Sequence, residues 1–397
     1  MRRLELDQIL TTMHAAQAEV SDLLFTVDRP LQVETYGELK PVDFDPSITR
    51  LTPFQTEMIA LNLIGDNVPH LESLLRHGSC DAAYALSEKA RFRVNIFSQR
   101  GNYSIVCRQL NAIIPTFEKL KMPEILREVP KEQTGLVLVT GATGSGKSTT
   151  LAAILHEINK AKPVHIVTLE DPVEYLHPHM KATFNQRELG VDFDSFANGL
   201  RAALRQAPKV ILVGEMRDRD TVKIALSAAE TGHLVLSTLH TINAGETVNR
   251  ILGMFEAEEQ EQIRIRMADS LRWIVSQRLT PKIGGARHAL FEIMGHNIRT
   301  EETIRLGESE GKTFYEIIEA NYPFGWRNFD HACIEAFEQG IITEETALLY
   351  CTKRGVVSRA IDIIKKERGE ITTTLGSLKM KNPPSKSGEE ISSFKLK

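Results

Sequence analysis

Residues 141–148 read Gly-Ala-Thr-Gly-Ser-Gly-Lys-Ser. This spacing of glycines, lysine and a hydroxyl residue is the Walker A pattern of a phosphate-binding loop. An apolar run at 136–139 predicts a strand before the loop, and 147–160 predicts a helix after it. Backbone N–H groups of such a loop, together with the helix N-terminus, can bind phosphate. We therefore predict an ATP site made by Gly141, Thr143, Gly144, Ser145, Gly146, Lys147, Ser148 and Thr149.

Strands and helices alternate on the carboxyl side of this loop. We predict strands at 164–169, 210–213 and 234–237, and helices at 195–206 and 220–230. The strands are nearly continuous apolar runs, which is typical of a parallel sheet covered by helices on both faces. Farther along, 243–279 and 298–368 are predicted to be mostly helical. The fold class is therefore α/β.

The N-terminal part has a different pattern. Residues 23–27 and 31–35 predict one strand pair, and 91–97 and 103–107 predict a second pair joined by a hairpin turn at 100–102. Helices are predicted at 5–18, 53–64 and 69–76, so this part is a small α+β domain. We divide the chain into a domain at 1–112, a proline-containing linker at 113–133, an ATPase domain at 134–368 and a disordered tail at 369–397.

Acidic residues follow two of the predicted strands. Glu215 ends the run Val210–Val213 plus glycine, where a carboxylate can hold Mg²⁺ with Ser148 or polarise the attacking water. Glu170, Asp171 and Glu174 follow the preceding strand. Of these, Glu174 is our candidate for the residue that positions or activates water, with a solvated acidic loop as the alternative.

Two histidines flank another buried strand. His240 follows its carboxyl end, where it can sense the γ-phosphate, and His233 precedes it. For His233 a structural and a functional role remain open. Lys147 should reach the β- and γ-phosphates.

The bulk composition sets limits on other classes of function. The 397 residues carry a net charge of −4, which gives no global basic field for nucleic acid. The cysteines Cys80, Cys107, Cys333 and Cys351 form no Cys-x-x-Cys pair, so a four-cysteine zinc site is not expected. No signal peptide and no apolar run of about 20 residues is present. We therefore predict a cytoplasmic protein without membrane insertion, able to dock on a membrane complex.

The motifs GATGSGKST, TLEDPVEY, VILVGEMRDRDT and AAETGHLVLSTLHT stand in one order. Together they resemble the Walker A, Asp box, Walker B and His box of the secretion ATPase superfamily, and within it the PilT-type ATPases that retract type IV pili. The resemblance spans roughly 20–365. It implies a PAS-like N-terminal domain joined to a RecA-like P-loop domain with a parallel-rich sheet and C-terminal helices.

The same resemblance implies roles for individual residues. Lys147 and Ser148 match the P-loop positions, Glu174 the catalytic glutamate, Glu215 the Walker B glutamate, and His233 and His240 the His-box histidines. The family also has arginines near the nucleotide, which are matched here by Arg91, Arg93, Arg108, Arg201 and Arg205. Among these, Arg93 and Arg108 are predicted to be catalytic.

The implied function is that of a homohexameric, ATP-hydrolysing motor for pilus retraction and twitching motility, peripheral at the inner membrane and acting on a pilus platform protein. One region departs from the retraction enzymes: their Ala-Ile-Arg-Asn-Leu-Ile-Arg-Glu motif corresponds here to HNIRTEETIRLGESEGKTFYEII. An accessory pilus ATPase or a type II secretion assembly ATPase is the nearest alternative. A RecA-like nucleic-acid motor and a nucleotide-gated module without hydrolysis are more distant ones.

Overall fold

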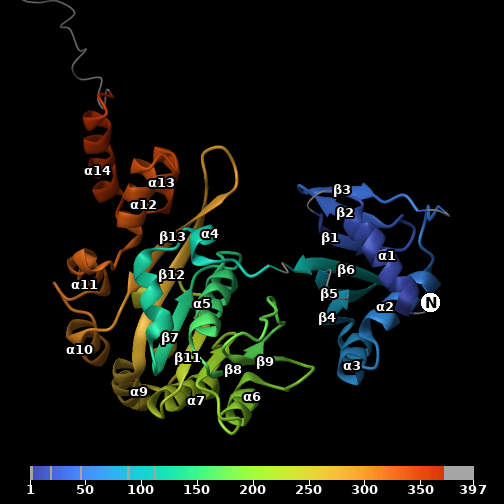
Figure 1. The fold of residues 1–397 in the computed structure, drawn as a ribbon, viewed down its shortest axis with the longest axis horizontal. Helices are drawn as coiled ribbons and strands as arrows, with labels where there is room; N and C mark the ends of the chain where they lie inside the picture. Colours follow the sequence, from blue (N-terminus) through green and yellow to red (C-terminus); the bar gives the residue numbers. More distant parts are fainter. Residues whose placement is uncertain (1–2, 18–19, 45–46, 87–89, 111–112, 371–397) are drawn as a thin grey trace, which may run out of the picture.

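The structure, a computed structural model, describes residues 3–17, 20–44, 47–86, 90–110 and 113–370. Figure 1 shows two bodies side by side, each built around its own sheet. The N-terminal body contains α1 (Arg3–Ala15), β1 (Val20–Phe25), β2 (Gln32–Thr35), β3 (Glu38–Pro41), α2 (Pro53–Ile64), α3 (Val68–His77), β4 (Ser79–Leu86), β5 (Ala90–Gln99) and β6 (Asn102–Leu110).

The N-terminal sheet is antiparallel, with the described strands in the order β3-β2-β1-β6-β5-β4. Buried and exposed residues alternate along β4 and β5, so one face carries the core and the other faces outward. The buried face packs on α1 and α2 through residues such as Leu10, Phe25 and Phe92. The predicted hairpin turn is confirmed, with positive φ at Arg100 (49°) and Gly101 (76°). Strands β3 and β4 were not predicted.

The larger body begins with α4 (Phe117–Leu120), η1 (Glu124–Lys131), β7 (Gly135–Thr140), α5 (Lys147–Ala161), β8 (His165–Glu170), β9 (Thr183–Glu188), α6 (Phe196–Ala203), β10 (Val210–Val213) and α7 (Arg219–Glu230). It continues with β11 (Leu234–Leu239), α8 (Ala244–Leu252), α9 (Ala257–Ser270), β12 (Leu271–Pro281) and β13 (Arg287–Met294). Its last helices are α10 (Ile298–Leu306), α11 (Phe314–Ala320), η2 (Tyr322–Phe324), α12 (Phe329–Glu338), α13 (Glu344–Tyr350) and α14 (Arg354–Glu367).

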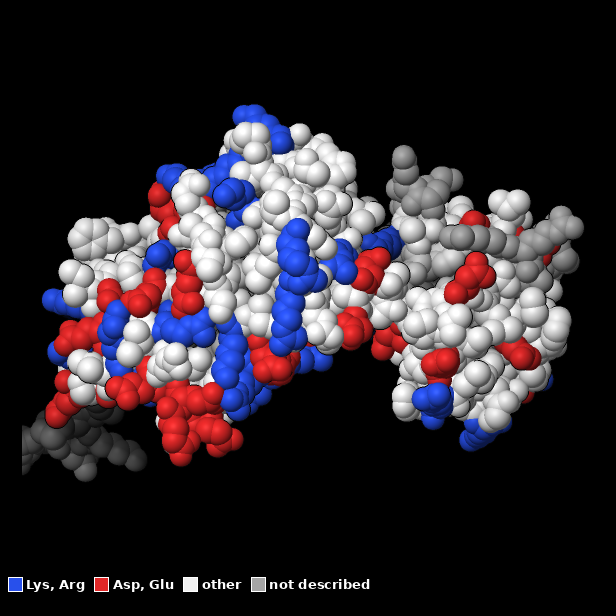
Figure 2. All heavy atoms as spheres, turned by 90° about the horizontal axis from the view of Figure 1, so that it is seen from below, with Lys and Arg blue, Asp and Glu red and all other residues white. Residues whose placement is uncertain are grey.

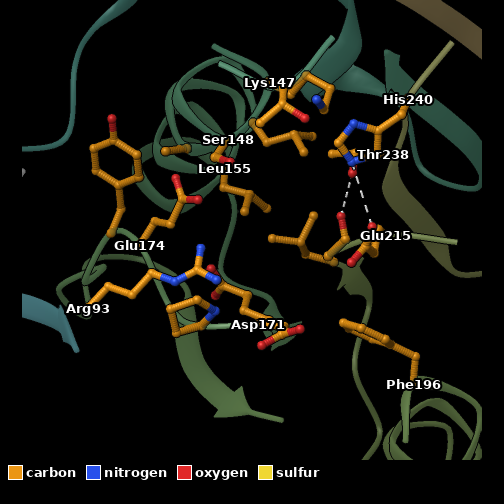
Figure 3. A pocket seen from close by; sticks show the side chains of 18 of the residues that line it. Arg93, Lys147, Ser148, Leu155, Asp171, Glu174, Phe196, Glu215, Thr238 and His240 are labelled. Atoms are coloured by element: carbon orange, nitrogen blue, oxygen red, sulfur yellow. Dashed lines mark hydrogen bonds and ion pairs between the residues drawn. The ribbon is translucent and has the colours of Figure 1, made fainter. Parts of the chain in front are cut away.

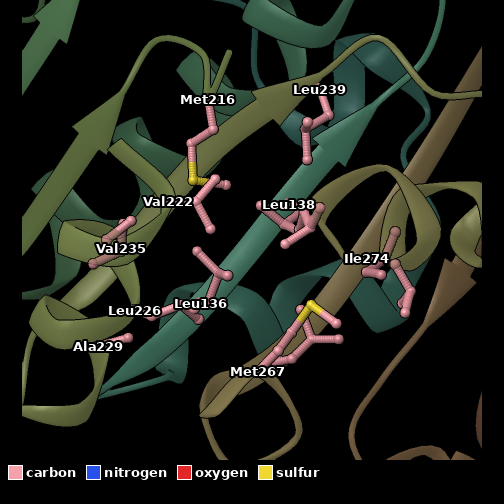
Figure 4. Packing of buried hydrophobic residues seen from close by; sticks show 14 of the residues in the cluster. Leu136, Leu138, Met216, Val222, Leu226, Ala229, Val235, Leu239, Met267 and Ile274 are labelled. Atoms are coloured by element: carbon pink, nitrogen blue, oxygen red, sulfur yellow. The ribbon is translucent and has the colours of Figure 1, made fainter. Parts of the chain in front are cut away.

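The sheet of this body has the order β13-β12-β7-β11-β10-β8-β9 and is parallel except for β13. Every residue of β7 is buried, because helices cover both faces of the sheet. Leu136 and Leu138 point to the cluster that includes α7 and α9 (Figure 4), whereas Val137 and Val139 point to α5 and η1. The predicted α/β class with a parallel-rich sheet is confirmed.

The structure differs from the sequence analysis at three places in this body. We predicted helix through 243–279, but β12 is a strand that begins at Leu271, directly after α9. The edge strand β9 was not predicted. The expected linker at 113–133 contains α4 and η1, and its Phe117, Leu126 and Val129 are buried against the α5 face. The part of the chain that packs into the larger body therefore begins before residue 134.

The C-terminal helix α12 packs on β13 and on α14, with a small core of its own that includes Leu290 and Phe329. Residues 371–397, most of the predicted disordered tail, lie outside the described residues. On the face shown in Figure 2, basic and acidic side chains are intermixed over the larger body, without a continuous basic track. Among the described residues, no helix combines the length and the apolar character needed to cross a membrane.

Candidate functional site

The phosphate loop connects the carboxyl end of β7 to the first turn of α5. Its backbone is crowded from behind by β12: a Cβ on Gly141, where φ is 145°, would lie 2.4 Å from the carbonyl oxygen of Gln277. A Cβ on Gly146, where φ is 91°, would lie 2.9 Å from the Gln277 side-chain nitrogen. Glycine is therefore required at both positions. Gly146 also caps α5 without a side-chain hydrogen bond, so the first N–H groups of the helix remain open to an anion.

Lys147 is 8% exposed, and its ammonium group is held by the loop itself. Its Nζ donates to the carbonyl oxygen of Gly141 at 2.9 Å and to that of Ala142 at 3.0 Å. Burial lowers the pKa of Lys147, whereas the negative charges of Glu215 and Glu174 act to raise it. The lysine is thus placed among carboxylates at the sheet edge, as the sequence predicts.

A cavity of about 330 Å³ opens in front of the loop (Figure 3). It lies where the carboxyl ends of the parallel strands meet, the usual ligand position in α/β sheets. The structure brings together in its lining eight of the predicted site residues: Arg93, Thr143, Gly144, Lys147, Ser148, Glu174, Glu215 and His240. Other members of the predicted site, Gly141, Ser145, Gly146 and Thr149, belong to the loop or its helix without lining the cavity.

Glu215 and His240 follow two neighbouring strands and lie next to one another on one wall of the cavity (Figure 3). His240 Nε2 lies 3.7 Å from Glu215 Oε2, and Glu215 also pairs with Arg217. Partial burial and the charges of Lys147 and Arg217 lower the pKa of His240, against the opposite effect of Glu215. The lowered pKa favours the neutral form of His240 at pH 7, in which one ring nitrogen donates a hydrogen bond and the other accepts one.

The acidic loop, residues 171–177 after β8, forms the opposite wall of the cavity. Glu170, the last residue of β8 before this loop, accepts hydrogen bonds from Thr168 Oγ1 at 2.6 Å and from Gln186 Nε2 at 3.1 Å. Burial raises the pKa of Glu170 to about 7, although these hydrogen bonds oppose the shift. Glu170 is thus part of the frame, whereas Glu174 lines the cavity beside Lys147.

Comparisons with known proteins agree with this geometry. A family model described as "Type II/IV secretion system protein" matches residues 82–317, more than half of the chain. The chain belongs to this family. It is 38% identical over 334 residues to the "Type IV pilus retractation ATPase PilT" of Pseudomonas aeruginosa, covering 84% of this chain and 94% of that protein.

Two further comparisons support the assignment of this chain to the secretion ATPases. The chain is 38% identical over 331 residues to the "Type IV pilus ATPase PilU" of Pseudomonas aeruginosa, covering 83% of this chain and 85% of that protein. The "Crystal Structure of the Pilus Retraction Motor PilT and Bound ADP" is 40% identical with a TM-score of 0.79, covering 89% of this chain and 98% of that one. The chain is therefore a PilT-type ATPase with an N-terminal domain and a RecA-like domain, and it binds nucleotide.

The oxygen atoms near the P-loop fit Mg²⁺. Glu215 is 9% exposed, and its buried Oε2 has no hydrogen-bond partner among the described residues. Mg²⁺ commonly binds one or two protein oxygens and completes its shell with phosphates and water. Ser148 and Glu215 would hold Mg²⁺ in this secretion ATPase, and the ion would neutralise charge on the phosphates.

Two predicted residues have other environments. Arg108 does not line the cavity, because its Nε donates to Asp22 Oδ1 at 2.9 Å on the sheet of the N-terminal domain. Its cross-strand neighbour Arg93 reaches the cavity instead, from the strand one position closer to the ATPase domain. His233 lies at the far end of β11, with Nδ1 3.0 Å from the carbonyl oxygen of Ala228, and does not line the cavity.

Several site residues escaped the sequence analysis. Arg217 lines the cavity and pairs with Glu215. Its position two residues after that carboxylate is a signal that could have identified it. Gln277 supports the loop from β12, and Gln186 supports the acidic loop from β9. Both glutamines lie on strands that were not predicted, so no sequence signal pointed to them.

Proposed function

We propose that this ATPase is a hexameric motor that retracts a type IV pilus. One observation supports hydrolysis above all: Lys147, Glu174 and Glu215 line one cavity with Arg93 from the other domain. Relatives named for pilus retraction support the filament as the load. In a ring, each subunit would present the same head-to-tail interface, so that every nucleotide site is equivalent.

The chain's own residues can be given roles in hydrolysis. Lys147 and the loop N–H groups would hold the phosphates, and Arg93 would offset charge that develops on the terminal phosphoryl group. Glu174 would position and activate the attacking water, while Glu215 would orient the metal or the water on the opposite wall. Neutral His240 carries a single N–H, which would donate to a terminal phosphate oxygen next to Glu215.

We further propose that the ring works at the cytoplasmic side of the inner membrane, on the platform protein of the pilus. A change in the relative orientation of the N-terminal and RecA-like domains would transmit force to the platform protein. Arg93 extends from the N-terminal domain into the cavity, so the occupant of the cavity is expected to bias that orientation.

An accessory pilus role is the second candidate. The identity to PilU is as high as that to PilT, and α10 and α11 carry the segment that departs from the retraction motif. In that case the chain would assist a main retraction ATPase instead of acting alone.

Deletion of the gene in the source organism, scored for piliation and surface motility together, tests the proposal. Excess pili that do not retract, with motility lost, would support retraction. Loss of pili would point to assembly. Retraction that fails only when a second retraction ATPase is also deleted would support the accessory role. Complementation with Lys147→Ala, which should bind nucleotide poorly and not restore motility, shows whether turnover is needed.

A further inference from the structure

The acidic loop is fixed on both sides of Glu174 by side chains of the edge strand β9. On one side, Gln186 Nε2 donates to the carbonyl oxygen of Tyr175 at 2.8 Å, and Gln186 Oε1 accepts from the N–H of His177 at 2.8 Å. On the other side, Glu188 Oε2 accepts from the N–H of Val173 at 3.1 Å. The residues directly before and after Glu174 are therefore tied to one strand.

The same oxygen of Glu188 also contacts the N-terminal domain. Arg91 Nη2, on β5, donates to Glu188 Oε2 at 2.7 Å. The two side chains are only 17% and 10% exposed, so the pair is well shielded from water. Removal of one member of such a pair leaves a poorly solvated charge, which is far more unfavourable than loss of a surface ion pair.

We propose that Glu188 and Arg91 are positioning residues for ATP hydrolysis. Arg91 holds the Glu188 carboxylate against the Val173 N–H, and this contact fixes the backbone from which Glu174 extends. The inference rests on the proposed role of Glu174 in activating water. It makes docking of the N-terminal domain a condition of turnover, in addition to the direct contribution of Arg93.

Arg91→Met provides the first test, because the loss of the guanidinium leaves Glu188 without its cation. The carboxylate then turns toward water and releases Val173. Small displacements of a catalytic group reduce rates strongly, so we expect kcat to fall by about tenfold to a hundredfold while the Kd for a fluorescent ATP analogue changes less than about threefold.

Glu188→Gln in the Arg91→Met background should restore much of the lost kcat. The amide oxygen still accepts from Val173, and no unpaired charge remains. A merely structural ion pair would not give this rescue. Arg327→Met is the matched control, since Arg327 and Glu335 form a pair of equal length, 2.7 Å and 23% and 27% exposed, in the C-terminal helices.

Hydrogen exchange of the segment 171–177 in the full-length variants gives a direct readout. Exchange there should be faster in Arg91→Met than in wild type and Arg327→Met, and slower again in the double variant. If kcat in Arg91→Met equals that of the control, if the double variant shows no rescue, or if exchange in 171–177 is unchanged, the proposal is overturned.

Glu174→Gln separates this proposal from the proposed function. If Glu174→Gln binds nucleotide and loses turnover while Arg91→Met behaves as the control, only the positioning role fails. If Glu174→Gln hydrolyses ATP at the wild-type rate, the assignment of Glu174 fails, and the positioning role fails with it.

Discussion

Thr150 in the first helical turn after the P-loop donates a hydrogen bond to the side-chain oxygen of Gln277, 2.8 Å away on β12. Both residues are buried, and the carbonyl oxygen of Gln277 lies behind Gly141. The strand that the sequence analysis assigned to a helix is thus the support for the phosphate loop. The Gln277 side chain fixes the start of α5, and the Gln277 carbonyl oxygen leaves room only for glycine at position 141.

Gln277→Leu is expected to leave the buried Thr150 hydroxyl without its acceptor and to lower the free energy of unfolding by about 1–3 kcal/mol. Denaturant unfolding measures the change. Thr150→Val added to Gln277→Leu removes the orphaned hydroxyl, so the double variant should be more stable than the sum of the single changes. Additive effects would show that the hydrogen bond contributes nothing.

His240→Ala should lower kcat by about tenfold or more without a comparable change in nucleotide affinity, because the imidazole is proposed to act on the phosphoryl group during reaction. Since the pKa of His240 is lowered from its ordinary value of 6.5, the neutral form dominates between pH 7 and 9. His240→Gln, which does not titrate, should therefore leave the shape of the pH–rate profile between pH 7 and 9 as in wild type. A new rise or fall in that range would contradict a neutral histidine.

Arg93→Ala should lower activity, whereas Arg108→Ala should lower stability without lowering activity. Arg93 lines the cavity, so its loss should reduce kcat by roughly 10³-fold, the lower end of what a phosphate-directed arginine contributes. Arg108 lies outside the cavity and pairs with Asp22, which is 5% exposed. Arg108→Ala should therefore keep wild-type turnover and lower thermal stability. Equal losses of activity in the two variants would support a catalytic role for Arg108.

Glu292→Gln should make stability less dependent on pH. Glu292 on β13 accepts from the N–H of Ala244 at 2.8 Å, and burial raises its pKa to about 7. Between its ordinary pKa of 4.5 and about 7, the unfolded chain releases this proton while the folded chain retains it, so rising pH favours unfolding. The variant should match wild type near pH 4.5 and exceed it above pH 7, by on the order of 3 kcal/mol. Thermal unfolding across this range, without nucleotide, measures the difference.

The sequence was sufficient to predict the structure where a local residue pattern is compatible with only one backbone arrangement. The spacing of Gly141, Gly146 and Lys147 predicts a loop between strand and helix, and the apolar run at 136–139 predicts a strand buried on both faces. Glu215 and His240 could be placed near the loop because parallel strands end at one sheet edge.

Other features depend on contacts that no local pattern encodes. α9 ends at Ser270 and β12 begins at the next residue, Leu271, without a glycine or proline at the junction, so the sequence carries no marker for the change from helix to strand. β9 is a polar edge strand, whose Gln186 and Glu188 serve the acidic loop instead of an apolar core. Arg93 and Arg108 are register partners on one sheet, and only tertiary placement decides which of them reaches the cavity.

The two hydrogen bonds that Lys147 donates to the carbonyl oxygens of Gly141 and Ala142 have a consequence for substrate choice. The ammonium carries three N–H donors and two of them bond these carbonyls, so a nucleotide that takes more than one donor must replace a carbonyl acceptor, and this exchange offsets part of the free energy of binding. A nucleoside with two or three phosphates brings anionic oxygens that can take their place. A monophosphate has too short a chain to do so, and we expect the loop to discriminate against it even where the base and the sugar fit equally well.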